Sequence, residues 1–526
     1  MPTATAGRRA QLPVLGTPAP APGPAAGQAR TLPADATRVG LVTLGCDKNT
    51  VDTERMLARL AHAGARVSAD ADDAEVLIIN TCGFIDVAKE ESIDAILDAV
   101  RLKQRGVVRA VVAMGCLVQR YRADLEKELP EVDLFLGLTE AERLVPELRA
   151  RGLLKDAVQT ATMEQPLRLL STSSRHTSYL KISEGCDHTC AFCAIPLMRG
   201  RHRSTPIELL VREARELEAS GVVELNLISQ DTTWYGRDIL RGADTGDGDY
   251  FIGRPFTGMA GVAGDGAAVT AAQPRLRAAR APGDARHGLL PELLRTLLDG
   301  TDIPWLRLFY MYPSGIYREL VDLIAREPRI VPYIDMPIQH GADSVLKRMR
   351  RPERQATIRE RVRWLRDAVP DLALRTTVIV GFPGETDDEF EDMLGLLEEI
   401  RFDHLGAFSY SVEDETPAAR MADQVEDDVK RERLERLLDV QRGISQERSD
   451  AWQGREVTVL IDALTGRDMD EPGAPAVGRG AVGRTARQAL EIDGSVHIGD
   501  ARGATPGEFV RARITGAVEG DMMAEL

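Results

Sequence analysis

Strand-like apolar runs alternate with amphipathic helical stretches along most of this chain. In the first part, the runs lie at 39–44, 75–79 and 107–114, and helical patterns occupy 52–63 and 88–102. Strands that alternate with helices indicate a parallel sheet, because each parallel pair needs a crossover connection. We therefore predict an open parallel α/β sheet over residues 38–150, with Asn49 or Asp52 as the cap of its first helix.

The same alternation resumes in the central part of the chain, over residues 176–450. Repeated βα units over such a length predict a partial or full (β/α) barrel. The apolar runs of this region lie at 179–183, 222–228, 305–310, 331–334, 374–380 and 404–410.

Four other segments differ in composition. Residues 1–37 are rich in Ala, Pro and Gly, which predicts a disordered extension, and residues 151–175 form a linker. Residues 238–288 show little periodicity, and we interpret them as a surface insertion in the barrel. Residues 453–526 contain short strand-like runs split by Gly, which is typical of a small β-barrel. Those runs lie at 457–461, 483–485, 496–498 and 509–514.

The bulk composition limits the class of protein. The 526 residues carry a formal net charge of −16, which argues against a protein that grips nucleic acid through its overall field. No apolar run approaches the roughly 20 residues of a membrane helix, and the N-terminus lacks the apolar segment of a signal peptide. We expect a cytoplasmic protein without membrane contact, whose six cysteines stay reduced and available to metal.

Three of these cysteines, Cys186, Cys190 and Cys193, follow the strand-like run at 179–183 with the spacing Cys-x3-Cys-x2-Cys. Three thiolates suit a [4Fe-4S] cluster whose fourth iron stays open. S-adenosylmethionine could chelate that iron, accept an electron from the cluster and yield an adenosyl radical. The alternative is a zinc knuckle that includes His188, but a structural zinc site takes four protein ligands and no second Cys/His pair has zinc spacing.

The other three cysteines, Cys46, Cys82 and Cys116, each follow one of the first three apolar runs. They are 36 and 34 residues apart, about one βα unit each. In an open parallel sheet the carboxyl ends of neighbouring strands lie side by side, about 4.8 Å apart, so these cysteines can converge on a second [4Fe-4S] cluster. The alternative is that they are small buried hydrophobic residues.

A Gly-rich turn after the run at 374–380 is a candidate for cofactor binding. Gly381 and Gly384 would let the backbone approach a ligand closely, although an ordinary βα turn has the same composition. Arg375, on the same strand, could pair with the methionyl carboxylate of S-adenosylmethionine or serve in a structural ion pair.

Further candidates follow other strand-like runs, where barrel active sites lie. Ser229 and Gln230 end the run at 222–228 and are assigned to cofactor binding. His340 fits a hydrogen-bonded structural residue better than an acid or base. Phe192 could flank the adenine or simply pack in the core.

Together these residues resemble the methylthiotransferase family of radical S-adenosylmethionine enzymes. That family has an N-terminal cluster domain, a radical barrel and a C-terminal TRAM domain, and the resemblance covers about residues 38–520. It implies that Cys186, Cys190 and Cys193 bind the radical cluster. The remaining three cysteines would bind an auxiliary cluster.

Four phrases look like the RimO branch, which methylthiolates an aspartate β-carbon of small-subunit ribosomal protein S-twelve. They are Leu44-Gly-Cys-Asp-Lys-Asn, Asn80-Thr-Cys-Gly-Phe-Ile, Lys181-Ile-Ser-Glu-Gly-Cys and Ser229-Gln-Asp-Thr. The sister MiaB branch modifies an adenosine of tRNA and usually carries Gln-Met-Asn after the first cysteine, which is absent here. Asp47 stands where the family usually has Pro.

The resemblance implies two uses of S-adenosylmethionine. One molecule methylates a sulfur on the auxiliary cluster, and another yields the radical that takes a hydrogen from the target carbon. The cofactors carry this chemistry, so no general acid or base is assigned. An electron donor and a sulfur source are implied but not identified, and the substrate could be free S-twelve or the assembled small subunit.

The charge of the last segment bears on the substrate. Residues 453–526 contain eight Arg, no Lys and twelve Asp plus Glu, a net charge of −4. An acidic domain suits a basic ribosomal protein, so tRNA is not expected as the substrate, unless Arg479, Arg484 and Arg487 form a local basic face. The rival functions are a tRNA adenosine methylthiotransferase and a non-catalytic binding module.

Overall fold

A computed structural model describes residues 36–68, 71–155, 166–170, 175–241, 287–465, 480–518 and 520–526. They form two compact units, in the main the described residues up to 170 and those from 175 onward. Most of the predicted extension (1–37) and insertion (238–288) lies outside the described residues, as do parts of the predicted linker. No helix in the described ranges is both long and apolar enough to cross a bilayer.

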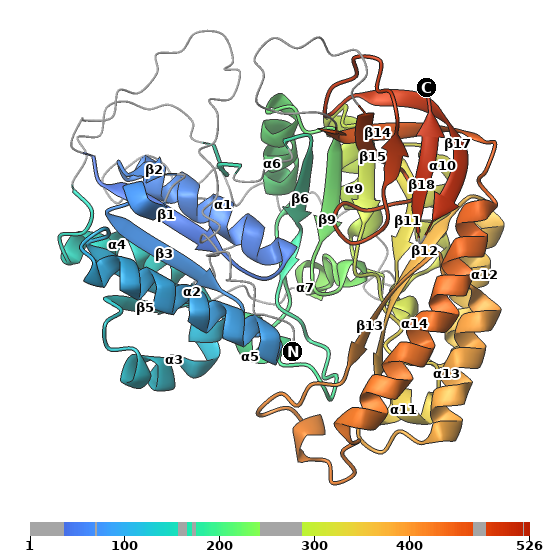
Figure 1. Ribbon diagram of the computed structural model, residues 1–526, viewed down its shortest axis with the longest axis horizontal. Helices are drawn as coiled ribbons and strands as arrows, with labels where there is room; N and C mark the ends of the chain where they lie inside the picture. The colour runs from blue at the N-terminus through green and yellow to red at the C-terminus, as the bar shows by residue number, and fades with distance from the viewer. Residues whose placement is uncertain are drawn as a thin grey trace, which may run out of the picture. The chain divides into compact units, whose positions relative to one another are not determined.

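The first unit is a five-stranded parallel sheet of order β2-β1-β3-β4-β5. Helices α1 and α2 cover opposite faces (Figure 1), so the central strands are buried on both sides and read as continuous apolar runs. The strands are β1 (Arg38–Thr43), β2 (Arg66–Ser68), β3 (Val76–Thr81), β4 (Ala110–Gly115) and β5 (Leu134–Gly137). The α-helices are α1 (Asp47–His62), α2 (Asp86–Gln104), α3 (Cys116–Glu128) and α4 (Leu144–Ala150).

This unit confirms the predicted open parallel sheet and corrects three details. Strands β2 and β5 were not predicted, because runs of three and four residues are too short to show a period. The predicted start of β4 at Val107 is wrong, because this residue lies in a turn in which its N–H donates to the Leu102 carbonyl. The predicted caps were also wrong, because Cys46 is the N-cap of α1 and Asn49 and Asp52 lie inside that helix.

The second unit begins with a six-stranded parallel sheet of order β13-β12-β11-β10-β9-β6. Its edge strands β6 and β13 do not pair with each other within the described residues, so the barrel is partial, one of the two forms predicted. The strands are β6 (Thr177–Lys181), β9 (Glu224–Ile228), β10 (Trp305–Leu308), β11 (Ile330–Asp335), β12 (Ala373–Val380) and β13 (His404–Ser409).

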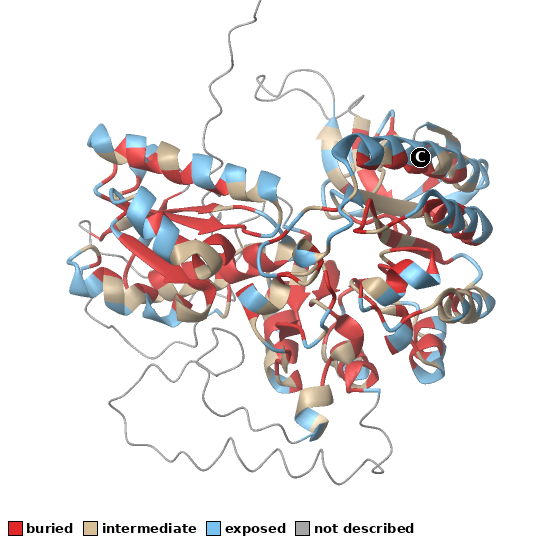
Figure 2. Ribbon diagram, turned by 90° about the horizontal axis from the view of Figure 1, so that it is seen from below, coloured by how far each residue is buried: buried red, intermediate tan, exposed pale blue. Residues whose placement is uncertain are grey.

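Helices connect and cover these strands. Figure 2 shows that the strands are largely buried and that the helices expose one side, the amphipathic pattern expected of surface helices. The helices are α5 (Ile195–Arg199), α6 (Ile207–Ala219), α7 (Arg237–Arg241), α9 (Leu290–Gly300), α10 (Arg318–Arg326), α11 (Asp343–Arg348), α12 (Gln355–Ala368), α13 (Asp387–Ile400) and α14 (Asp427–Asp450). A short antiparallel pair, β7 (Ser183–Glu184) and β8 (Arg203–Ser204), flanks the first cysteine of the 186–193 loop.

A closed five-stranded barrel of order β14-β15-β16-β18-β17 ends the second unit. It confirms the predicted C-terminal β-barrel, and its core includes Val459, Ile461, Val496 and Ile514. The strands are β14 (Glu456–Thr465), β15 (Gly480–Thr485), β16 (Val496–Ile498), β17 (Phe509–Val518) and β18 (Asp521–Glu525). Only β18 was missed, because its alternation spans just five residues.

The two flanks of the predicted insertion meet. The Leu289 N–H donates to the Tyr235 carbonyl at 2.7 Å. A side chain on Gly236 would overlap Leu289, so the two chain segments lie against each other. The chain thus leaves and returns at one place, as an insertion requires. Its first residues form α7, where Asp238 accepts hydrogen bonds from the N–H and the hydroxyl of Ser204 at 2.8 and 2.6 Å.

Candidate cluster-binding sites

The first unit brings Cys46, Cys82 and Cys116 to the same edge of its sheet. Cys46 is in the turn after β1, Cys82 directly follows β3, and Cys116 is the first residue of α3, directly after β4. Strands β1, β3 and β4 are neighbours, with Thr43 opposite Asn80 and Thr81 opposite Gly115. Their carboxyl ends therefore converge, which is where open α/β sheets bind ligands.

Close backbone packing at this edge requires glycine. A Cβ on Gly45, whose φ is +89°, would lie only 2.8 Å from the Cys82 Sγ. Gly115 has φ +107° and ψ −156°, a region that essentially only glycine occupies, and a Cβ there would lie 2.6 Å from the Thr81 carbonyl oxygen. The two glycines allow the cysteine-bearing turns to lie against one another.

Asn49 ties these turns together, a role that the sequence analysis did not assign. Its Nδ2 donates to the carbonyl oxygens of Leu44 at 2.8 Å and Thr81 at 3.2 Å. Its Oδ1 lies 3.8 Å from the Cys116 Sγ, within range of a thiol hydrogen bond. The signal in the sequence is a polar residue three positions after Cys46, a pattern that also predicts a helix cap.

Burial controls the chemistry of these thiols. Burial raises the pKa of Cys116 to about 12, and it also raises the pKa of Cys82. Both thiols are therefore protonated at neutral pH unless a metal binds, because a coordinated thiol is deprotonated outright. Cys46 is exposed, so one position of this edge is open to solvent. Three sulfur donors around one edge fit an iron–sulfur cluster.

In the second unit, Cys186, Cys190 and Cys193 lie in one loop between β7 and α5. Gly185, with φ +72°, reverses the chain before the first cysteine, and a side chain there would overlap the Arg201 carbonyl. The Cys186 N–H donates to the Gly200 carbonyl at 3.0 Å, which closes the loop. Cys186 and Cys190 are buried, and burial raises the pKa of the Cys186 thiol well above its usual range.

An aspartate and an aromatic ring hold the His188 side chain. Its Nε2 lies 2.7 Å from the Asp231 Oδ2, and its ring stacks on Tyr312 with centroids 4.2 Å apart. In the part of the chain that the structure describes, no group of three or more His, Cys, Asp or Glu side chains could hold a metal ion as it stands. A four-iron cluster needs its thiolates spaced more widely than a lone ion does.

Ser229 and Gln230 directly follow β9 and carry orphaned polar atoms. The Ser229 Oγ and the Gln230 Oε1 are buried and have no hydrogen-bond partner within the described residues. Because buried polar atoms are nearly always paired, they fit a polar ligand at this end of the strand.

The Gly-rich turn after β12 is tightly packed. Gly381 and Gly384 have φ values of +71° and +72°, and a side chain on Gly381 would overlap Lys430. The helix that follows, α13, starts with a capping box between Thr386 and Glu389. The Gly381 N–H donates to the Glu385 carboxylate at 2.9 Å and the Gly384 N–H donates to the Asp423 carbonyl at 2.6 Å, so the protein itself uses both donors.

The remaining predicted residues have partners within the protein. Arg375 pairs with Asp335 at 3.0 Å and with Asp493 at 3.5 Å, so the structural alternative accounts for it. His340 is buried and lies 3.2 Å from the Glu385 carboxylate, in agreement with a structural role. Phe192 packs against a small core that includes Phe382 and Tyr410, which favours the packing interpretation.

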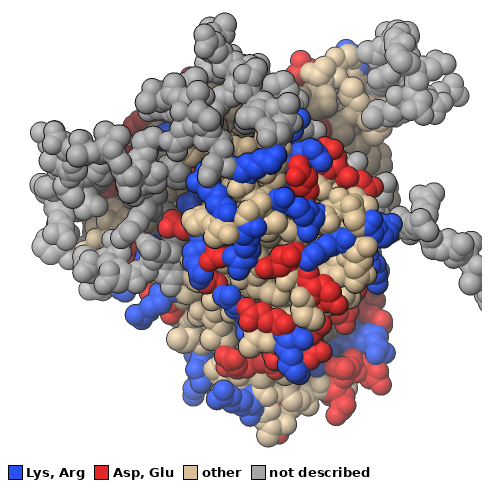
Figure 3. Space-filling view, turned by 90° about the vertical axis from the view of Figure 1, so that its left-hand side faces the viewer, with Lys and Arg blue, Asp and Glu red and all other residues tan. Residues whose placement is uncertain are grey.

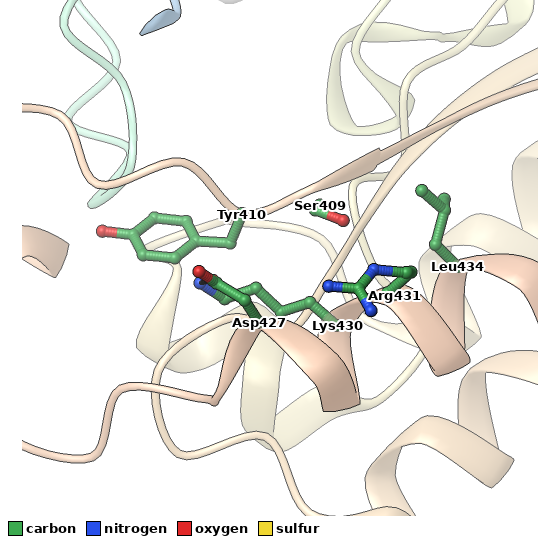
Figure 4. A pocket seen from close by; sticks show the side chains of 6 residues that line it. All are labelled: Ser409, Tyr410, Asp427, Lys430, Arg431 and Leu434. Atoms are coloured by element: carbon green, nitrogen blue, oxygen red, sulfur yellow. Dashed lines mark hydrogen bonds and ion pairs between the residues drawn. The ribbon is translucent and has the colours of Figure 1, made fainter. Parts of the chain in front are cut away.

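A shallow pocket lies near the end of β13 and the start of α14 (Figure 4). It is lined by Ser409, Tyr410, Asp427, Lys430, Arg431 and Leu434. The Lys430 Nζ pairs with Asp427 at 2.9 Å, so the charge of this lysine is compensated. None of the predicted site residues lines the pocket, and it is not assigned to the site.

Comparison with known proteins identifies the family. Three family models match: "Uncharacterized protein family UPF0004" at residues 38–137, "Radical SAM superfamily" at 274–397 and "TRAM domain" at 454–526. Proteins named "Ribosomal protein uS12 methylthiotransferase RimO" from Anaeromyxobacter sp. strains K and Fw109-5 are each 44% identical to this chain, over 93% of both chains. One of the same name from Desulforudis audaxviator is 41% identical over 94% of this chain and 98% of its own.

This chain belongs to the RimO family. It is therefore a radical S-adenosylmethionine methylthiotransferase, and the predicted resemblance and three-part architecture are confirmed. Membership implies a [4Fe-4S] cluster and S-adenosylmethionine as cofactors.

Proposed function

We propose that this enzyme methylthiolates the β-carbon of an aspartate in ribosomal protein uS12, the protein called S-twelve above. The observation that carries the proposal is the convergence of Cys46, Cys82 and Cys116 at one sheet edge, in addition to the three-cysteine loop of the second unit. A radical enzyme that only cleaves S-adenosylmethionine has no need of a second set of thiolates. The relatives' shared name supports the substrate.

The two cysteine sets have separate roles in this proposal. Cys186, Cys190 and Cys193 hold the radical cluster, and Cys46, Cys82 and Cys116 hold an auxiliary one. When bound, the clusters and S-adenosylmethionine supply the adenosyl radical and the methylated sulfur. The protein supplies thiolates on rigid strand ends and a loop closed by the Cys186–Gly200 hydrogen bond.

The S-adenosylmethionine site would lie at the carboxyl ends of β9 and β12. The unpaired Ser229 Oγ and Gln230 Oε1 can bond the polar groups of the cofactor, and Gly381 and Gly384 keep side chains out of the turn after β12. We assign Phe192 and Arg375 no direct contact with S-adenosylmethionine. The core packing of Phe192 and the ion pairs of Arg375 with Asp335 and Asp493 already account for these two residues.

The C-terminal barrel would recognise the protein substrate and carry no chemistry. Arg484 and Arg487 are 2% and 7% exposed, and they pair with Glu224 and Asp403, so these two cannot form the basic face that tRNA phosphates need. Arg479 lies outside the described residues. Figure 3 faces the side of the first unit and not the barrel, and on that face Lys and Arg mix with Asp and Glu. A basic ribosomal protein suits the C-terminal barrel, because residues 453–526 are acidic. A ribosomal substrate would place the reaction in the cytoplasm.

Mass spectrometry of uS12 from cells with and without this gene tests the substrate. We expect the methylthio mass increment on one aspartate, only when the gene is present. Purified protein, reconstituted with iron and sulfide and supplied with S-adenosylmethionine and dithionite, should then be offered uS12, small subunits and tRNA in parallel. Modified tRNA with unmodified uS12 would reject the proposal in favour of the tRNA enzyme.

A further inference from the structure

The Cys190 thiol has two donors close by that no assigned role uses. The Tyr312 hydroxyl lies 3.7 Å from the Cys190 Sγ, and the Arg351 Nη1 lies 3.9 Å from the same sulfur. Cys190 itself is 5% exposed. Both distances are within the range of hydrogen bonds to sulfur, and they converge on only this one of the three thiols in the loop.

Arg351 is fixed in place by contacts on every side of its guanidinium. Its Nη2 donates to the Pro337 carbonyl at 2.9 Å, and its Nε lies 3.1 Å from the Glu353 carboxylate. Its Cζ lies over the Tyr312 ring, 3.8 Å from the ring centroid. The Arg351 side chain is wholly buried. A buried cation held this rigidly acts on its neighbours through a low effective dielectric.

The backbone around Arg351 also contacts the loop. The Ala191 N–H donates to the Met349 carbonyl at 2.9 Å, so the segment after α11 is tied to the residue next to Cys190. The distance between the guanidinium and the Cys190 thiol is thus set by the backbone and does not depend on a flexible side chain alone.

We propose that Arg351, assisted by Tyr312, raises the reduction potential of the cluster that Cys190 holds. The inference rests on the proposed radical cluster. Reduction adds one electron from a low-potential one-electron donor, with no bond made or broken, so the cluster becomes more negative by one charge. A fixed cation and hydrogen bonds to a cluster sulfur favour the more negative state. Arg351 and Tyr312 are positioning residues here, because they act through the Cys190 sulfur.

Glu353 should act in the opposite direction. Its carboxylate partly offsets the Arg351 charge, and it also accepts a hydrogen bond from the Ser314 hydroxyl at 3.0 Å. Neutralising Glu353 would leave the guanidinium more strongly positive toward the thiolate. A purely structural role for Arg351 predicts no such pair of opposite shifts.

The test isolates the radical cluster and measures its potential. The parent is full-length protein with Cys46, Cys82 and Cys116 changed to Ala, reconstituted anaerobically and titrated against mediators while the reduced cluster is followed by electron paramagnetic resonance. We expect Arg351→Met to make reduction about tenfold less favourable, a shift of about 59 mV to more negative potential for one electron. Tyr312→Phe should shift the potential the same way by less, and Glu353→Gln should shift it the other way.

Arg307→Met is the matched control. Arg307 is also buried, paired with a carboxylate (Glu224, 2.7 Å) and placed over a tyrosine ring (Tyr333, 4.6 Å), but among the described residues none of its hydrogen-bond, ion-pair or ring partners is a cysteine. It should leave the potential unchanged, even if the free energy of unfolding falls.

The outcomes separate this inference from the proposed function. A parent protein that binds no cluster would refute the radical-cluster assignment itself. A parent with a cluster, but with equal potentials in Arg351→Met and Arg307→Met, would overturn only the role of Arg351. If Arg351→Met loses its cluster, Tyr312→Phe and Glu353→Gln decide: opposite shifts support the inference, and two unchanged potentials reject it.

Discussion

Cys186, Cys190 and Cys193 lie within eight residues of one loop, whereas Cys46, Cys82 and Cys116 come from three separate strand ends. In the loop, local spacing brings the thiols together, and one glycine with a positive φ reverses the chain before them. At the sheet edge, the strand order and register bring the thiols together. A ligand set can therefore be encoded by spacing alone or by topology, and the second kind is sensitive to changes anywhere in the sheet.

The largest effect is expected from removal of the three thiols of the 186–193 loop. Changing Cys186, Cys190 and Cys193 together to Ala should lower the iron content from about eight to about four per chain, because each [4Fe-4S] cluster holds four irons. Cleavage of S-adenosylmethionine to 5′-deoxyadenosine should be abolished. Iron analysis and chromatography of the cleavage product check this. A triple variant that keeps both clusters would show that the loop is not a ligand set.

The matching change at the sheet edge should separate the two half-reactions. With Cys46, Cys82 and Cys116 changed to Ala, 5′-deoxyadenosine should still form, because its cluster is held elsewhere in the chain. Transfer of the methylthio group to uS12 should vanish, as seen by mass spectrometry of the product. Product formation at the wild-type rate would contradict an auxiliary cluster at this edge.

A buried ion pair in the second unit should matter for stability more than for metal binding. Glu224 of β9 is buried and pairs with Arg307 and, at 2.7 Å, with Arg484 of the C-terminal barrel. Arg484→Gln leaves this carboxylate short of a partner and should cost about 3–5 kcal/mol in the free energy of unfolding. Denaturant titration measures it, and Arg511→Gln, at an exposed ion pair, is the control with an expected cost of about 0–1 kcal/mol.

The same carboxylate predicts a pH dependence. Burial alone would raise its pKa, but the guanidinium groups of Arg307 and Arg484 hold the pKa of Glu224 at about 2, below an unfolded value of about 4.3. The stabilisation is present above pH 4.3 and is lost as the pH falls toward 2. Stability of the Arg484→Gln variant should fall less steeply over this interval. Parallel slopes for the two proteins would show that Arg484 does not set this pKa.

A smaller effect probes how the sheet edge depends on its backbone. Gly115→Ala forces a side chain into a glycine-only conformation and against the Thr81 backbone, so it should destabilise the first unit by about 1–3 kcal/mol and reduce iron at the auxiliary site. Gly106 also has a positive φ, +75°, but open space around its Cα. Gly106→Ala should cost some stability and leave the iron content unchanged. Equal iron loss in both variants would show that the close packing at Gly115 is unimportant.

The smallest effect is expected from deletion of the predicted insertion, which contains none of the six cysteines. Because Tyr235 and Leu289 are hydrogen-bonded at 2.7 Å, removal of residues 242–286 and closure with a short glycine linker should leave the fold and both clusters intact. The cut keeps Asp238, which accepts two hydrogen bonds from Ser204. Soluble yield, iron content and 5′-deoxyadenosine formation are the measures. Insoluble protein would show that the segment is not an insertion.

Several features could be predicted because they depend on local pattern. The alternation of apolar runs and helical stretches predicted the parallel sheets, and short Gly-separated runs predicted the terminal barrel. The β2, β5 and β18 strands and the contacts of Asn49 and Arg351 escaped prediction. Asn49 and Arg351 act on partners more than 30 residues away, such as Thr81 and Cys190, and no local pattern marks such a contact.

The sequence by itself determined which six cysteines are candidate cluster ligands, since residue type and spacing carry that information. It also determined the order of the three regions. The tertiary structure decided that Arg484 and Arg487 point into buried ion pairs and that Arg375 pairs with Asp335 and Asp493. An arginine side chain is long and flexible enough to face solvent, a ligand or a carboxylate. Which of these it faces depends on whether the fold buries an opposite charge nearby.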